Sequence, residues 1–160
     1  MIEGNLWVSK KFKKEMHPIR PRRELFGEIV QIDASIHLWF EDRGDKCALI
    51  VFIDDATSKL TSLKFCKSEC LEGYFNALED HLLRYGRPRA LYSDRHAIFG
   101  GSDKIHNAQF IRALKELGID SILAGSPQAK GRVERANQTL QDRLVKEMRL
   151  RNICNIEDAN

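Results

Sequence analysis

Three carboxylates in this sequence stand where they could gather around a metal ion. Asp33 ends a run rich in Ile and Val, Asp94 ends a second apolar run, and Glu134 lies early in a long helical segment. Three carboxylates brought close together repel one another, which raises their pKa values. Hard divalent cations relieve this repulsion, and carboxylate oxygens with water suit Mg²⁺ or Mn²⁺. Two such ions about 3.5–4 Å apart can clamp the attacking and leaving oxygens of a phosphodiester displacement.

Each of these carboxylates also has a plain structural interpretation. An Asp at the end of a strand commonly hydrogen-bonds within a turn. A Glu in the first turns of a helix interacts favourably with the helix dipole. The three residue types alone therefore leave both interpretations open.

The pattern of apolar residues predicts the elements that must position the carboxylates. Ser68 is expected to cap one helix, and Ser126 with Pro127 is expected to start the last one. Glu134 follows Val133 of the predicted buried stripe, so it should lie at the edge of the face that packs on the sheet. Strands are predicted over 26–33, 47–53, 60–66, 89–93 and 119–124, and helices over 68–85, 107–117 and 126–149.

The order of these elements predicts an α/β fold around a five-stranded mixed sheet. Three strands joined by short turns should form an antiparallel meander, and the βα units that follow should add parallel strands with helices on both faces. The ligand site is then expected near the carboxyl ends of the parallel strands. We divide the chain into a basic N-terminal arm (1–26), a core (27–150) and a C-terminal tail (151–160).

Basic charge is concentrated near the two ends of a chain whose net charge is +3. Residues 1–26 and 125–151 each carry seven basic and three acidic side chains. Such ends suit a polyanionic partner, although Lys and Arg also simply solvate helices. The sequence has no apolar run long enough to span a membrane and no signal-peptide core, and its four cysteines do not form a disulfide framework. These features predict a cytoplasmic protein without a membrane partner.

Four blocks of sequence point to a known family. They are IVQIDAS around Asp33, ALIVFIDDATSKL after it, ALYSDRH around Asp94, and SPQAKGRVERANQTLQDRL around Glu134. In this order and spacing the chain resembles the DDE transposase and retroviral integrase catalytic core, and it looks closest to bacterial insertion-sequence transposases. The resemblance covers roughly residues 20–150. It implies a ribonuclease-H-like fold, with 27–150 as the integrase catalytic core.

The resemblance also implies an activity, a cofactor and site residues. The activity would be metal-dependent cleavage and transfer of DNA strands by a polynucleotidyl transferase. The catalytic, metal-binding residues would be Asp33, Asp94 and Glu134, with two Mg²⁺ or Mn²⁺ ions per active site. His96, two residues after Asp94, is a possible accessory residue, although a loop histidine without a role fits as well. The candidates for contacts with DNA are Lys130, Arg132, Arg135 and Asn137.

The implied partners are transposon-end and target DNA and further copies of the chain, as a homodimer or higher homo-oligomer. Two other functions remain open. One is an inactive, truncated transposase relic that only binds DNA through its basic ends, since no helix-turn-helix is evident before the core. The other is a ribonuclease-H-like nuclease on the same fold. The Lys-Gly-x-x-Glu sequence that ends at Glu134 favours the transposase.

Three smaller motifs have structural interpretations. Asp54-Asp55 resembles the acidic pair of receiver domains, but the strand predicted directly afterwards favours a turn. Cys66 and Cys70 lack the spacing of a structural zinc site. Trp39-Phe40 is expected to pack in the core.

Overall fold

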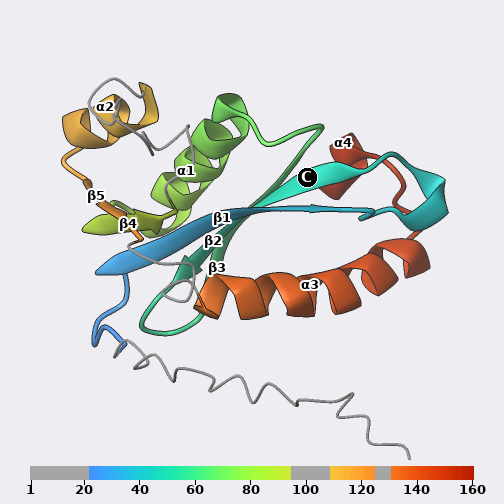
Figure 1. The fold of residues 1–160 in the computed structure, drawn as a ribbon, viewed down its shortest axis with the longest axis horizontal. Coiled ribbons are helices and arrows are strands. Elements are labelled where there is room, and N and C mark those ends of the chain that lie inside the picture. Colours follow the sequence, from blue (N-terminus) through green and yellow to red (C-terminus); the bar gives the residue numbers. More distant parts are fainter. Residues whose placement is uncertain (1–21, 95–108, 125–130) are drawn as a thin grey trace, which may run out of the picture.

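The computed structural model describes residues 22–94, 109–124 and 131–160, and these form one mixed sheet with helices on both faces (Figure 1). The sheet has five strands in the order β3-β2-β1-β4-β5, which confirms the predicted fold class. The strands are β1 (Ile29–His37), β2 (Cys47–Asp54), β3 (Leu60–Cys66), β4 (Ala90–Ser93) and β5 (Asp120–Leu123). The helices are α1 (Leu71–Tyr85), α2 (Gln109–Glu116), α3 (Gly131–Leu150) and α4 (Ile156–Ala159), with a short 3₁₀ helix, η1 (Glu41–Arg43).

The central strand is β1, which pairs differently with its two neighbours. It runs antiparallel to β2, and β2 runs antiparallel to β3, so the predicted meander is confirmed. On the other side β1 runs parallel to β4, from Ile29 opposite Ala90 to Gln31 opposite Tyr92. Strand β5 continues the parallel half beside β4. The sheet therefore changes from antiparallel to parallel at β1.

Every residue of β2 is buried because both faces of the sheet are covered. One apolar cluster joins the sheet to α1 and α2, and a second joins its other face to α3 and α4. Figure 1 shows α1 and α2 on one side of the sheet and α3 on the other. Trp39 and Phe40 are fully buried in the second cluster, so their predicted core role is confirmed. None of the helices in the described ranges is long and apolar enough to cross a membrane.

Strand β1 continues four residues past Asp33, so the predicted strand end was wrong. The reason is pairing with β2, in which Asp33 lies opposite Val51 and His37 opposite Cys47. This antiparallel ladder provides hydrogen-bonding partners for the backbone beyond the polar residue. Asp33 is thus a mid-strand residue on the sheet face that α3 covers.

Helix α1 begins later than predicted and ends where predicted. Its N-cap residue is Cys70, which makes no side-chain capping hydrogen bond, so Ser68 is not the cap. At the other end Gly86 has a φ of 78°, a conformation that glycine adopts readily, and its N–H donates to Leu82 O. The predicted cap at Ser126 and Pro127 lies outside the described residues.

Residues 151–160, expected to be a tail, pack onto the sheet. Asn155 caps α4, since its side chain accepts a hydrogen bond from Asp158 N. Ile153 and Ile156 pack against the α3-side cluster. The Asn160 side chain accepts from the backbone N–H of Phe65 on β3 (2.8 Å) and donates to its carbonyl (3.0 Å). The end of the described chain therefore covers part of an edge strand.

The buried side chain of His81 on α1 should make the folded protein less stable at acidic pH. Burial lowers its pKa, and this outweighs the opposing effects of Asp54 and Asp80. The folded state thus favours neutral His81, and the unfolded state binds more protons once the pH falls below about 6.5. We expect the free energy of unfolding, measured with urea, to decrease as the pH falls from 7.5 to 5.5. His81→Leu should lose less stability over the same range, and an identical loss in both proteins would contradict this.

Candidate active site

Asp33 and Asp94 lie level with each other on neighbouring parallel strands. Gln31 of β1 is opposite Tyr92 of β4, and each aspartate stands two residues further along its strand direction. Asp94 directly follows Ser93, the last residue of β4. Both aspartates also act electrostatically on the same phenol, that of Tyr74. The register thus carries Asp33 and Asp94 toward the carboxyl end of β4, where a ligand site was expected.

Tyr74 of α1 is a buried residue that no local sequence pattern singles out. Its hydroxyl donates a hydrogen bond to Glu69 Oε1 at 2.7 Å. Burial raises the pKa of Tyr74 most, followed by Glu69, and Asp33 and Asp94 raise it further. The phenol consequently stays protonated and neutral beside the carboxylates.

Helix α3 meets Asp33 through Asn137. The Asn137 Nδ2 atom donates to Asp33 Oδ2 at 3.0 Å. Its carbonyl oxygen Oδ1 is buried and has no hydrogen-bond partner. Asn137 was predicted to contact DNA, whereas the structure directs its amide nitrogen to the first carboxylate. The amide is an inward-facing part of the site, since the residue is only 8% exposed.

Glu134 lies one helical turn before Asn137 and is exposed. Residues three apart on a helix share a face, so Glu134 stands next to the point where α3 contacts Asp33. Across residues 22–94, 109–124 and 131–160, no three His, Cys, Asp or Glu side chains form a group that could hold a metal. The structure thus brings Asp33 and Asp94 together, and it does not close the set with Glu134.

The atoms around Asp33 suit a hard divalent cation. Carboxylates of Asp33 and Asp94 supply oxygen donors, and the unpartnered Asn137 Oδ1 is a further buried oxygen beside them. An oxygen-only donor set favours Mg²⁺ or Mn²⁺ over metals that prefer thiolate or imidazole. The residues present therefore fit the expected metal.

The two arginines of α3 that were predicted to contact DNA occupy different environments. The guanidinium of Arg132 pairs with buried Asp55 at 2.5 Å, and the Arg132 side chain is only 10% exposed. Arg132 also lines a surface groove that it shares with Arg135, so its predicted DNA contact stays a prediction. Arg135 is exposed and lines a groove of about 450 Å³ between α3 and the β2–β3 turn, together with Arg22. Lys130 and His96 lie outside the described residues.

The acidic pair Asp54-Asp55 divides into two roles. Asp54 accepts hydrogen bonds from the backbone N–H (2.8 Å) and hydroxyl (2.6 Å) of Thr57, which is the predicted turn role. Asp55 instead accepts from the Gln31 side chain and from Arg132. Asp55 lies in the turn, as predicted, and no local sequence pattern marks its contacts with Gln31 and Arg132.

Comparison with known proteins finds two transposases. A putative transposase of Sinorhizobium fredii, y4bF, is 53% identical over 165 residues, which span 100% of this chain and 36% of that protein. The transposase for insertion sequence IS1202 of Streptococcus pneumoniae is 40% identical over 154 residues, spanning 92% of this chain and 33% of that protein. The chain thus spans about a third of the length of these relatives. No family model matches the sequence.

Solved structures with a similar fold include retroviral integrases. The HTLV-2 integrase catalytic core domain in complex with magnesium has a TM-score of 0.65 at 20% identity, covering 86% of this chain and 82% of that one. The simian T-cell lymphotropic virus intasome in complex with the PP2A regulatory subunit B56 gamma has a TM-score of 0.66 at 20% identity. The match covers 91% of this chain and 51% of that one. The catalytic core domain of BIV integrase has a TM-score of 0.57 at 23% identity, covering 83% of this chain and 78% of that one. The chain is therefore similar in sequence to a part of known transposases, and it has the ribonuclease-H-like fold of the retroviral integrase catalytic core.

Proposed function

We propose that this chain is the catalytic core of a transposase that cuts and joins DNA strands in a metal-dependent reaction. The observation that supports the proposal is the parallel pairing of β1 and β4 as far as Gln31 and Tyr92, two residues before Asp33 and Asp94, together with the hydrogen bond from Asn137 of α3 to Asp33. The transposase relatives support the same activity. They are about three times as long, so the proposal concerns the step that this core performs.

Each residue then has a defined role. Asp33, Asp94 and Glu134 would hold Mg²⁺ or Mn²⁺, with two ions per site, and magnesium accompanies the HTLV-2 integrase core. Bound divalent ions polarise phosphodiester oxygens and lower the pKa of water or of a 3′-hydroxyl. Asn137 keeps the Asp33 carboxylate oriented through its Nδ2 hydrogen bond.

DNA would approach from the side of the molecule where α3 begins. Arg135 and Arg22 line the groove there, and their guanidinium groups suit phosphate oxygens. We propose that Lys130, which directly precedes α3 in the sequence, also contacts the DNA. An integrase neighbour was solved in an intasome and another in dimeric and trimeric forms, so we propose that this chain also works on DNA as a homo-oligomer. A cytoplasmic location is part of this proposal.

A nicking assay tests the proposed reaction. The 160-residue chain is incubated with supercoiled plasmid and with oligonucleotide duplexes in Mg²⁺, in Mn²⁺ and in EDTA. We expect nicks that leave 3′-hydroxyl ends, dependent on the metal and absent in EDTA. DNA binding without any cleavage would instead favour the inactive relic. Cleavage confined to the RNA strand of RNA–DNA hybrids would favour the nuclease.

Arg135→Ala should weaken DNA binding without loss of fold. One lost phosphate contact should reduce the salt dependence of log K by about one unit of slope, equally for all DNA sequences. Fluorescence anisotropy at several salt concentrations measures both affinity and slope. The matched control is Arg84→Ala on α1, on the opposite face of the sheet, where Arg84 pairs with Asp80. Equal slopes for wild type and Arg135→Ala would remove Arg135 from the DNA contacts.

A further inference from the structure

We propose that the buried cluster of Gln31, Asp55 and Arg132 is a positioning device that sets the register of α3 on β1 and so places Glu134 and Asn137 beside Asp33. This inference rests on the proposed function, because it assigns these residues to the assembly of that site. None of the three is proposed to touch DNA or metal. They would act through the helix that carries the site residues.

Asp55 is the centre of the cluster. It is fully buried, and its Oδ1 atom accepts hydrogen bonds from Gln31 Nε2 (2.7 Å) and from Arg132 (2.5 Å). Its Oδ2 atom accepts from the backbone N–H of Arg23 at 3.0 Å. Its own N–H donates to Ile29 O at 2.9 Å, which attaches it to the start of β1. The carboxylate thereby links the chain before β1, strand β1 and helix α3.

Gln31 connects the same cluster to the backbone of α3. Its side-chain oxygen accepts from the backbone N–H of Val133 at 3.3 Å. Val133 lies in the first turn of α3, where N–H groups lack partners within the helix. Gln31 is two residues before Asp33, and Val133 is the residue before Glu134. One buried amide side chain therefore joins the strand and the helix right beside their proposed catalytic residues.

Two further contacts extend this junction into a regular ladder. Asn137 donates to Asp33, and Gln141 Nε2 donates to Ser35 Oγ at 2.9 Å. The helix contributes every fourth residue and the strand every second residue. Four helical residues rise about 6 Å and two strand residues about 6.6 Å, so the two periods match. A shift of α3 by one turn would bring polar residues opposite each other again, with Asn137 at Gln31 and Gln141 at Asp33. The same shift would separate Arg132 from Asp55, so this ion pair is what selects a single register.

The ion pair itself points to positioning rather than to stability. Arg132 has a buried Nε atom with no hydrogen-bond partner, so part of its guanidinium is desolvated without compensation. Buried ion pairs of this kind seldom stabilise a fold more than apolar side chains of the same size do. Apolar residues would, however, allow α3 to slide along the sheet. The charged pair joins the two elements at one defined point.

The experiment compares Asp55→Asn and the double variant Asp55→Asn/Arg132→Gln with wild type. The double variant leaves no buried charge unpaired, so it keeps the test valid where the single variant unfolds. The first readout is hydrogen exchange of amides in the first turn of α3, including Val133. The second is the rate of DNA cleavage at saturating DNA, measured separately from the DNA concentration that gives half the maximal rate.

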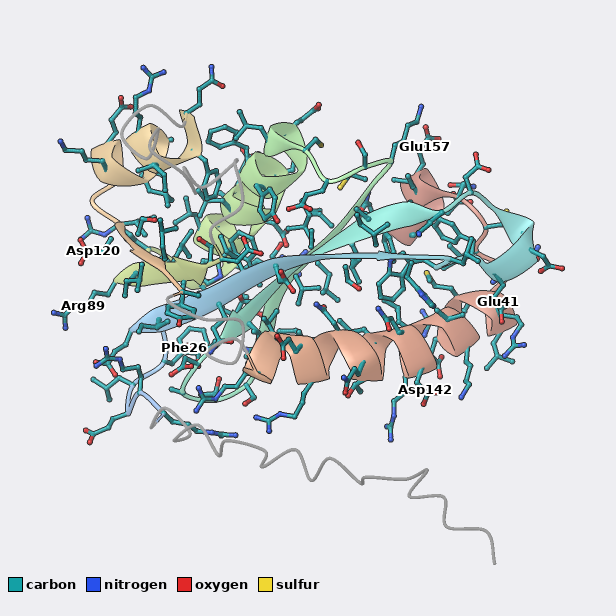
Figure 2. All side chains as sticks on the ribbon, viewed as in Figure 1. Phe26, Glu41, Arg89, Asp120, Asp142 and Glu157 are labelled. Atoms are coloured by element: carbon teal, nitrogen blue, oxygen red, sulfur yellow. The ribbon has the colours of Figure 1, made fainter. Side chains whose placement is uncertain are left out.

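We expect amide exchange in the first turn of α3 to accelerate at least about tenfold, because the junction that protects it is lost. The saturated cleavage rate should fall at least about tenfold, with the half-saturating DNA concentration changed less than about twofold. Asp142→Asn is the matched control, since Asp142 is 64% exposed and pairs only with Lys146 among described residues, on the side of α3 that faces away from the sheet (Figure 2). It should behave as wild type in both readouts.

Two results would overturn the inference. One is wild-type amide exchange and wild-type saturated rate in a folded double variant. The other is an Arg132→Gln variant that raises the half-saturating DNA concentration at an unchanged saturated rate, because Arg132 would then be a DNA contact. If wild type itself cleaves no DNA, the proposed function fails, and the exchange readout still tests whether the cluster positions α3.

Discussion

Asp33→Asn should abolish metal-dependent DNA cleavage while the protein stays folded. The substitution removes the charge of the carboxylate that Asn137 contacts, and the new amide oxygen can still accept the hydrogen bond from Asn137 Nδ2. Metal ions stabilise transition-state charge by several kcal/mol, so loss of about 4 kcal/mol reduces the rate by about 10³-fold. The nicking assay in Mg²⁺ and in Mn²⁺ measures this loss.

Folding and activity must be separated in this experiment. Asp142→Asn removes a carboxylate from the exposed side of α3 and should cleave DNA at the wild-type rate. Thermal unfolding should give Asp33→Asn a midpoint within a few degrees of wild type. An Asp33→Asn protein that retained more than about a tenth of the wild-type cleavage rate would contradict the assignment of Asp33.

Trp39→Ala should cause the largest loss of stability of any substitution discussed. The indole is fully buried, donates to Ser35 O at 3.0 Å, and packs edge-on against Phe65 with ring centroids 5.7 Å apart. Truncating a buried Trp to Ala typically costs about 3–5 kcal/mol, a large part of the 5–15 kcal/mol that holds most domains together. Urea unfolding should show a lower midpoint at an unchanged slope.

Trp39→Phe is the control for this core substitution. It keeps an aromatic ring in the cluster between α3 and the sheet and loses only part of the volume and the indole hydrogen bond. Its loss of stability should be clearly smaller than that of the alanine variant. If Trp39→Ala unfolded within about 1 kcal/mol of wild type, the cluster would not be the core that attaches α3 to the sheet.

Strands β2 and β3 were predictable because short apolar runs between turn-forming residues are local features of the sequence. The predicted strand over 60–66 coincides with β3, and the one over 47–53 falls one residue short of β2. Both are bounded by turn-forming residues. The end of β1 was not predictable in the same way, because Asp33 reads as a terminator and only the pairing with β2 carries the strand on to His37.

Helix α1 shows why the spacing of large apolar residues predicts a helix better than its buried face. The spacing of large apolar residues over 68–85 selects Leu71, Phe75, Leu78 and Leu82, and all four pack against the core. The most deeply buried residues of α1, however, are Gly73, Tyr74, Ala77, Leu78 and His81. Small residues permit the closest approach, and a Cβ added at Gly73 would come within 2.7 Å of Ile50 Cδ1. The closest contact is therefore made by residues that a hydrophobic pattern ranks low.

The site was predictable in its carboxylates and not in its supporting contacts. The apolar runs before Asp33 and Asp94 predicted two parallel strands that carry both residues toward the same edge of the sheet, although β1 continues past Asp33 to His37. The contacts from Val133 to Gln31 and from Arg132 to Asp55 span 102 and 77 positions. Polar residues at such separations leave no local pattern, so only the fold reveals that they meet.

Binding of Mn²⁺ measured by electron paramagnetic resonance tests the central claim that Asp33, Asp94 and Glu134 form one metal site. The wild-type chain should bind Mn²⁺, and Asp33→Asn, Asp94→Asn and Glu134→Gln should each weaken binding at least about tenfold, because each removes one charged oxygen ligand. Asp142→Asn should bind as wild type does. Undiminished Mn²⁺ binding by folded Glu134→Gln, or no binding by the wild-type chain, would contradict the claim.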